Sequence, residues 1–78
     1  MEMFFQSNFL LEKPHRYYLF SSGTDMSSRV YNSRCEAEQA MYEFCEINHI
    51  HGLECTEYDK HERKYSNHNG VRFYINRI

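Results

Sequence analysis

Five histidines and three cysteines are the side chains of this 78-residue chain best suited to binding a metal ion. The candidate ligands at close spacing are His49, His51 and Cys55, with His61 or Cys45 as a fourth. Structural zinc sites usually contain ligand pairs at short, repeated spacing. No Cys-x-x-Cys pair occurs in this sequence. We therefore expect neither a metal site nor a cofactor.

A polar stretch near the C-terminal end contains the side chains that could act in catalysis: His61, Glu62, Lys64, His68 and Asn69. A histidine or a carboxylate in this stretch could serve as a general base. However, the chain has no G-x-S-x-G, P-loop or dinucleotide-binding motif. Cys35 and Cys45 could act as nucleophiles only beside a base, and the sequence reveals none. We therefore expect that the protein is not an enzyme.

Charge is distributed unevenly along the chain, although the formal net charge is only −2. Residues 36–59 contain seven acidic and no basic side chains, whereas residues 60–78 contain five basic and one acidic side chain. Segments of opposite charge can attract different partners, because each creates a local potential of its own sign. This separation favours a binding function over a catalytic one.

One amphipathic helix must position the acidic residues. Ser33 and Glu36 form the S-x-x-E pattern of a capping box, in which each side chain accepts a hydrogen bond from a backbone N–H at the helix start. Apolar residues then recur at helical spacing: Ala37, Ala40, Met41, Phe44 and Cys45. Gly52 supplies a natural stop. The pattern predicts a helix from Arg34 to about His49.

Two strands are predicted before this helix. Residues 16–21 are rich in aromatic side chains, which favour a pleated surface. Residues 27–31 return as the second strand of a hairpin. Gly23 lies in the turn between them, where a positive φ angle is expected.

The predicted strands after the helix are residues 53–58, which alternate apolar and polar side chains as in a half-buried strand, and residues 71–75. An Asn-Gly turn precedes the second of them. Residues 59–66 are polar and fit either an extension of the hairpin or a loop. The predicted order is ββαββ, an α+β fold in which an antiparallel sheet carries one amphipathic helix on one face.

The sequence is predicted to form a single domain, residues 1–78, with residues 15–78 as its ββαββ core. Residues 1–14 are predicted to form an apolar N-terminal arm or an extra strand, and a short helix is also compatible with their sequence. The apolar side chains of this arm are Met3, Phe4, Phe5, Phe9, Leu10 and Leu11. An arm of this kind, or a sheet edge, could also mediate a homodimer.

Cellular location is indicated by the cysteines and by the N-terminal residues. The odd number of cysteines indicates free thiols in a reducing compartment. The N-terminal residues lack the pattern of a secretory signal, and no stretch approaches the roughly 20 apolar residues of a membrane span. We expect a cytoplasmic protein with no membrane partner.

An acidic surface is the leading candidate for a binding site. Its predicted residues are Glu36, Glu43 and Glu46 on the helix, Glu54 and Glu57 on the following strand, and Tyr42 as an aromatic anchor. Such a surface complements a basic one, and complementary potentials speed encounter and fix the register of a complex. We expect it to bind a host protein or nucleoprotein complex.

The alternative is a small RNA- or DNA-binding module. Its predicted residues are Lys60, Arg63, Lys64, Tyr65 and Arg72, in the basic C-terminal hairpin. Basic side chains can neutralise phosphates while tyrosines stack on bases. The isoelectric point of about 6.2 disfavours this alternative.

A short, tyrosine-rich chain with a capped acidic helix between hairpins resembles the small phage-encoded proteins that inhibit host defence, the anti-CRISPR proteins among them. The resemblance covers the general plan of residues 16–78 and involves no diagnostic motif. It implies a stoichiometric inhibitor, encoded by a phage or mobile element, that blocks a nucleoprotein enzyme by occupying its nucleic-acid or partner site. The resemblance assigns no function to an individual residue.

Overall fold

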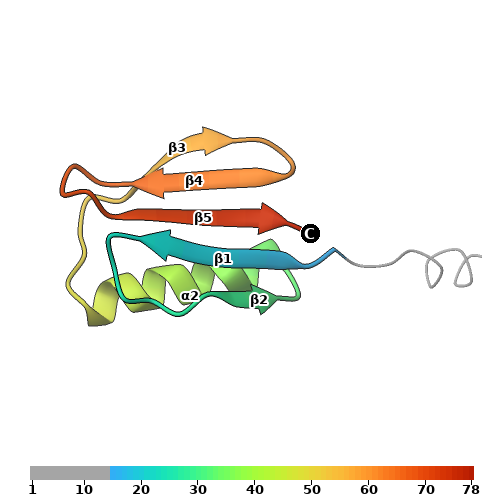
Figure 1. Cartoon of the computed structure of the whole chain (residues 1–78), viewed down its shortest axis with the longest axis horizontal. Helices are drawn as coiled ribbons and strands as arrows, with labels where there is room; N and C mark the ends of the chain where they lie inside the picture. Colours follow the sequence, from blue (N-terminus) through green and yellow to red (C-terminus); the bar gives the residue numbers. More distant parts are fainter. Residues whose placement is uncertain (1–14) are drawn as a thin grey trace, which may run out of the picture.

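The computed structural model of the chain describes residues 15–78, so the predicted N-terminal arm lies outside the described residues. The elements, in chain order, are β1 (Tyr17–Ser22), β2 (Arg29–Tyr31), α2 (Arg34–Ile47), β3 (Glu54–Tyr58), β4 (Glu62–Ser66) and β5 (Arg72–Arg77) (Figure 1). The prediction of an α+β fold with one helix on an antiparallel sheet is confirmed. Residues 15–78 contain no helix with the length and hydropathy that crossing a membrane requires.

The five strands form one antiparallel sheet in the order β2-β1-β5-β4-β3. The additional strand is β4, which lies within the polar residues 59–66 and pairs with both β3 and β5. The predicted hairpin at the Asn-Gly turn therefore joins β4 to β5, and β3 forms an outer edge. The observed order is ββαβββ.

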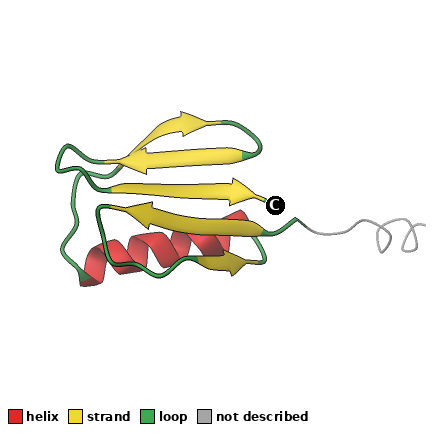
Figure 2. Ribbon diagram, viewed as in Figure 1, coloured by secondary structure: helices red, strands yellow, loops and turns green. Residues whose placement is uncertain are grey.

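The helix covers one face of the sheet and only part of that face. Figure 2 shows α2 on a single side of the strands. Its backbone lies over β2, β1 and β5 and away from β3, and it reaches β4 through the side chains of Glu38 and Tyr42. As a result, all five residues of β3 are exposed, and the prediction that residues 53–58 form a half-buried strand is wrong. The face of the sheet that α2 does not cover is called the open face below.

A small core lies between α2 and the covered face of the sheet. Leu19, Phe73 and Ile75 from the strands are essentially inaccessible to solvent, as are Ala37 and Met41 from the helix. Burying a side chain the size of leucine or phenylalanine contributes about 1.5–3 kcal/mol. The apolar stripe predicted for the helix is therefore the one that packs.

The helix begins as predicted but ends differently. The Glu36 N–H donates to Ser33 Oγ (3.1 Å), and the Asn32 N–H donates to Glu36 Oε1 (3.3 Å). At the other end, His49 has a positive φ of 56°, and the Ile50 N–H donates to the carbonyl of Cys45 (2.8 Å). This is the pattern of a Schellman motif, so His49 rather than Gly52 ends the helix.

Two turns meet at one end of the sheet. Gly23 follows β1 with a φ of +84°, as predicted, and a side chain there would lie 2.6 Å from the carbonyl oxygen of Gly70. The turn that contains Gly70 is closed by Asn67, whose Oδ1 accepts hydrogen bonds from the N–H groups of Asn69 and Val71. These contacts fix the relative positions of β1 and β5, which form the middle of the open face.

Candidate functional site

The outer face of α2, called the outer helix face below, carries three exposed carboxylates: Glu36, Glu43 and Glu46. None of the three lies within 4.0 Å of a lysine, arginine or histidine nitrogen of residues 15–78. The predicted acidic stripe on the helix is thus present as an exposed surface, and basic side chains of the described residues do not neutralise it.

Two of these carboxylates occupy positions that are unfavourable for the helix itself. Glu43 and Glu46 are three residues apart, a spacing at which like charges repel. The last turn of α2 contains no basic residue, so Glu46 also faces the negative end of the helix dipole without compensation. Each effect costs a few tenths of a kcal/mol.

Tyr42 projects from α2 on the side that faces β4. Its side chain is 52% exposed, and its ring lies edge-on to the ring of Tyr65 at a centroid distance of 6.4 Å. Partial burial, followed by the negative charge of Glu38, raises the pKa of the Tyr42 hydroxyl, which therefore stays protonated. Tyr42 is half exposed beside the outer helix face, and its role as an aromatic anchor stays a prediction.

The structure separates the remaining acidic candidates from this surface. β3 is at the far edge of the sheet, and its register pairs Glu54 with Ser66 and Glu57 with Lys64. Cross-strand partners point to the same side of a sheet. Glu54 and Glu57 therefore lie on the open face, and Glu57 forms an ion pair with Lys64 (3.4 Å). The prediction that they continue the acidic stripe is wrong.

The basic candidates are divided in the same way by the alternation of side chains along β4. Arg63 and Tyr65 point toward α2, where the Arg63 guanidinium and the Tyr65 hydroxyl both donate to Glu38 Oε2. Tyr65 is only 3% exposed. Burial and the hydrogen bond to Glu38 raise its pKa, so it remains a neutral donor. Tyr65 cannot stack on a base, and the prediction for that residue is wrong.

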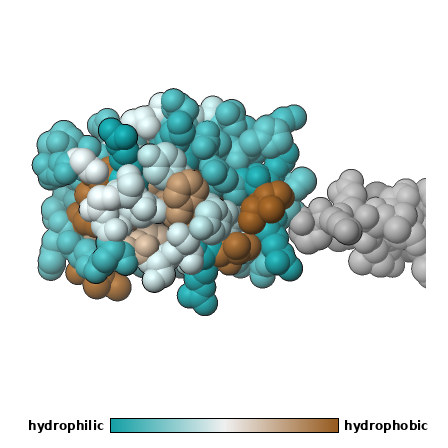
Figure 3. All heavy atoms as spheres, viewed as in Figure 1, coloured by the Kyte–Doolittle hydropathy of each residue, from teal (hydrophilic) through white to brown (hydrophobic). Residues whose placement is uncertain are grey.

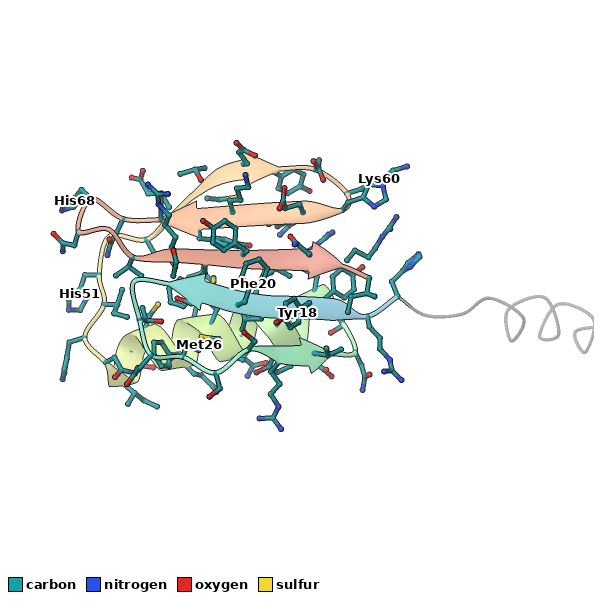
Figure 4. The ribbon with its side chains drawn as sticks, viewed as in Figure 1. Tyr18, Phe20, Met26, His51, Lys60 and His68 are labelled. Atoms are coloured by element: carbon teal, nitrogen blue, oxygen red, sulfur yellow. The ribbon has the colours of Figure 1, made fainter. Side chains whose placement is uncertain are left out.

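Three residues of the basic set remain exposed or partly exposed. Lys60 lies in the turn between β3 and β4 (Figure 4). Lys64 and Arg72 lie on the open face, because they pair across the strands with Tyr74 and Ser66 respectively. Arg72 is exposed and forms no ion pair with a side chain of residues 15–78.

The open face carries a row of aromatic rings that neither the acidic nor the basic set of predicted site residues included. Phe20 of β1 is directly opposite Tyr74 of β5, and their rings stack with centroids 4.8 Å apart and 13° between planes. The ring of Tyr18 is 5.2 Å from that of Phe20. Tyr18 and Phe20 alternate with buried Leu19 in the sequence. This period of two could have placed both rings on the uncovered face.

These rings are visible from the side of the sheet that lies in front of the helix. Figure 4 places Tyr18 and Phe20 on β1. In the same view, Figure 3 shows a pale and tan area at the centre of the face, with hydrophilic side chains above it and brown, hydrophobic groups at its left and right. The uncovered face of an antiparallel sheet is commonly polar, so an aromatic centre on such a face is unusual.

A shallow groove of about 280 Å³ lies beside this aromatic row, between β5 and the β3–β4 hairpin. The residues that line it are Thr56, Glu57, Lys64, Tyr65, Ser66, Arg72 and Tyr74. It therefore combines two tyrosines, two cations, two aliphatic hydroxyl groups and the carboxylate of Glu57, although the Tyr65 hydroxyl points away toward Glu38 of α2. These groups can bind and orient a ligand through stacking, hydrogen bonds and charge.

The proposed metal ligands are dispersed in the fold. Cys45 is buried in the core, Cys55 is on the edge strand β3, and His49 ends the helix. Within residues 15–78, no three of the histidine, cysteine and acidic side chains are grouped closely enough to hold a metal ion. Comparison with family models, curated proteins and solved structures found no match to this chain.

Proposed function

We propose that this is a non-enzymatic binding protein that attaches to a basic surface of a host protein or nucleoprotein complex. The contact is made by the outer helix face. The observation that supports the proposal is the exposure of Glu36, Glu43 and Glu46 without a basic side chain of residues 15–78 near them. Tyr42 supplies an aromatic contact next to these carboxylates.

The energetics of α2 also favour a binding role. Glu43 and Glu46 destabilise the helix through mutual repulsion and through the helix dipole. Proteins commonly retain residues that lower stability where a function depends on them.

The expected consequence of binding is inhibition of the partner. A compact acidic surface can occupy a groove that otherwise holds a phosphate backbone, because both present negative charge to the same basic side chains. The resemblance to phage-encoded inhibitors of the anti-CRISPR type favours this mode of action. It predicts a stoichiometric complex whose affinity falls as salt is added.

Charge reversal on the helix tests the proposal. Wild-type protein and the variant Glu43→Lys/Glu46→Lys are immobilised and used to capture partners from a lysate of the natural host. Lysines in the last turn complement the helix dipole, so the variant is expected to fold. We expect the partner held by the wild type to be lost from the variant. Equal capture by both proteins would contradict the proposal.

The matched control is Glu54→Lys/Glu57→Lys. It makes the same change in net charge on the opposite side of the molecule, on an exposed edge strand. We expect this variant to retain the partner. Equal loss from both variants would mean that overall charge, and not the outer helix face, determines capture.

A further inference from the structure

The open face carries aromatic and cationic groups that the proposed contact through α2 does not use. The rings of Tyr18, Phe20 and Tyr74 form a continuous row across β1 and β5, the two strands that cross the middle of the sheet. Each ring is held by its neighbour, so little side-chain freedom remains to be lost when a ligand binds. This arrangement is preorganised for stacking.

Tyr74 connects the aromatic row with the groove. One side of its ring stacks on Phe20, and the other side borders the groove toward β4. Lys64 stands directly across from Tyr74 on β4, and Arg72 is two residues away on the same face of β5. A planar group that enters the groove beside Tyr74 would therefore lie close to both cations.

Both cations can accept a new anionic partner. Arg72 is exposed and forms no ion pair with residues 15–78. Lys64 pairs with Glu57, whose side chain is 63% exposed, and exposed ion pairs of this kind contribute about 0–1 kcal/mol. The ion pair between Lys64 and Glu57 is therefore weak enough to be exchanged for one with a phosphate, and the displaced Glu57 carboxylate remains in the groove, where it lowers the affinity. The hydroxyl groups of Thr56 and Ser66 add hydrogen-bonding capacity in the same groove.

We propose that the open face binds single-stranded nucleic acid, with one base against Tyr74 in the groove and adjacent phosphates on Arg72 and Lys64. The strand continues over Phe20 and Tyr18. Bases of a single strand are free to stack on aromatic side chains, whereas those of a duplex are enclosed within the helix. This site is independent of the proposed function of the outer helix face.

The acidic residues of the molecule limit the affinity but do not exclude it. The outer helix face is separated from the open face by the helix, whose diameter is about 10 Å, and by the sheet. At physiological salt the screening length is about 8 Å, so those carboxylates repel a strand on the open face only weakly. Glu54, Glu57 and Glu62 are closer, since they share the open face. We therefore expect a dissociation constant of roughly 1–100 μM at about 50 mM salt.

Fluorescence anisotropy with labelled oligothymidylate and oligouridylate of about 12 nucleotides tests the proposal. We expect saturable binding by the wild type. The variant Tyr74→Leu is expected to bind roughly 5- to 150-fold more weakly, which is the loss associated with one stacked base. Absence of saturable binding at low salt would overturn the proposal.

The salt dependence of binding provides a second test, which does not require a change in a packed ring. Lys64→Gln/Arg72→Gln alters two side chains outside the core and should reduce the slope of log affinity against log salt by about 1.4, or 0.7 for each phosphate contact. The matched controls are Lys60→Gln and Tyr42→Leu, which remove a lysine and a tyrosine from other surfaces. Equal losses in the controls and in the open-face variants would overturn the proposal.

A protein ligand for the open face is the competing outcome. If no oligonucleotide binds and Tyr74→Leu loses a protein captured from the host lysate, the open face is a protein-docking surface and the nucleic-acid proposal is wrong. Thermal unfolding of each variant accompanies these measurements. If a variant unfolds at the same temperature as the wild type, its change in affinity is not caused by a loss of stability.

Discussion

The outer helix face and the open face present different kinds of side chain. The outer helix face presents Glu36, Glu43 and Glu46 without basic neighbours among residues 15–78, and its one large exposed ring is Tyr42 at the border. The open face has a row of stacked rings, with two cations and three carboxylates around it. The first can attract a partner from a distance, whereas the second depends on direct contact.

The difference follows from how each surface is formed. On the helix, the apolar stripe packs in or against the core, and the outer side carries charge together with the exposed side chain of Ile47. On the sheet, one side of every strand faces α2 or lies beside it, and the other side has no covering element within residues 15–78. Aromatic residues on that second side are not buried by α2, so packing in the core does not explain why they are aromatic.

The largest expected effect comes from a substitution in the core between α2 and the sheet. Met41 is fully buried between α2 and the sheet. Met41→Ala should lower the free energy of unfolding by about 2–5 kcal/mol, because it removes buried contacts and leaves a cavity. Chemical denaturation measures this change. A loss below 1 kcal/mol, on the order of a surface substitution, would show that α2 is not held by this core.

A smaller loss is expected at Glu38, which links the helix to β4. Glu38→Ala leaves the Arg63 guanidinium and the Tyr65 hydroxyl without their shared acceptor, and should cost about 1–3 kcal/mol. Tyr65→Phe removes one of the two hydrogen bonds and should cost about 0.5–1.5 kcal/mol. Denaturation curves for both variants would rank them. A larger loss for Tyr65→Phe would contradict the role assigned to Glu38.

On the outer helix face, a substitution is expected to raise the free energy of unfolding instead of lowering it. Glu46→Gln removes a negative charge from the last turn of α2, where no basic residue compensates it. We expect the free energy of unfolding to rise by about 0.3–1 kcal/mol, while affinity for the partner falls. Thermal unfolding and capture are measured on the same preparation. Greater stability with unchanged capture would mean that Glu46 is only a solvated side chain.

The smallest expected effect concerns the turn that joins β3 to β4 at the edge of the open face. Asp59 Oδ1 accepts hydrogen bonds from the N–H groups of His61 (2.7 Å) and Glu62 (2.8 Å), and these bonds lower the pKa of the Asp59 carboxyl. The carboxylate is favoured in the folded state, so this stabilisation is present at neutral pH. It declines as the pH falls below the ordinary pKa of aspartate and through the lowered value.

Asp59→Asn provides the measurement, because asparagine keeps the acceptor and lacks the charge. The difference in melting temperature between wild type and variant should be greatest near neutral pH and should shrink toward acid pH. A difference that does not change with pH would show that the charge of Asp59 plays no part.

Local sequence patterns predicted those parts of the fold that a single local interaction determines. The capping box at Ser33 and the apolar stripe fixed the start and the packed side of α2, and the alternation of Phe73 and Ile75 identified β5. The end of α2 was missed because His49 adopts a conformation that the nearby Gly52 was expected to supply. The strand β4 was ambiguous because its residues are polar, and the two strands that flank it determine its pairing.

The candidate surfaces were harder to predict, because they depend on the order of the strands. Glu57 could be placed beside the helix only by assuming that β3 is its neighbour, and the sheet puts β3 at the far edge. Likewise, Lys64 and Tyr65 are adjacent in the sequence yet point to opposite sides of β4. The row of Tyr18, Phe20 and Tyr74 joins two strands that are separated by most of the chain.

The most direct test of the proposed function is to determine which face the captured partner contacts. Cross-saturation by NMR from the unlabelled partner to isotopically labelled protein reports proximity at each residue. We expect the greatest loss of signal at Tyr42, Glu43 and Glu46 of α2. Losses confined to Tyr18, Phe20 and Tyr74 would contradict it, because the partner would then be bound to the open face.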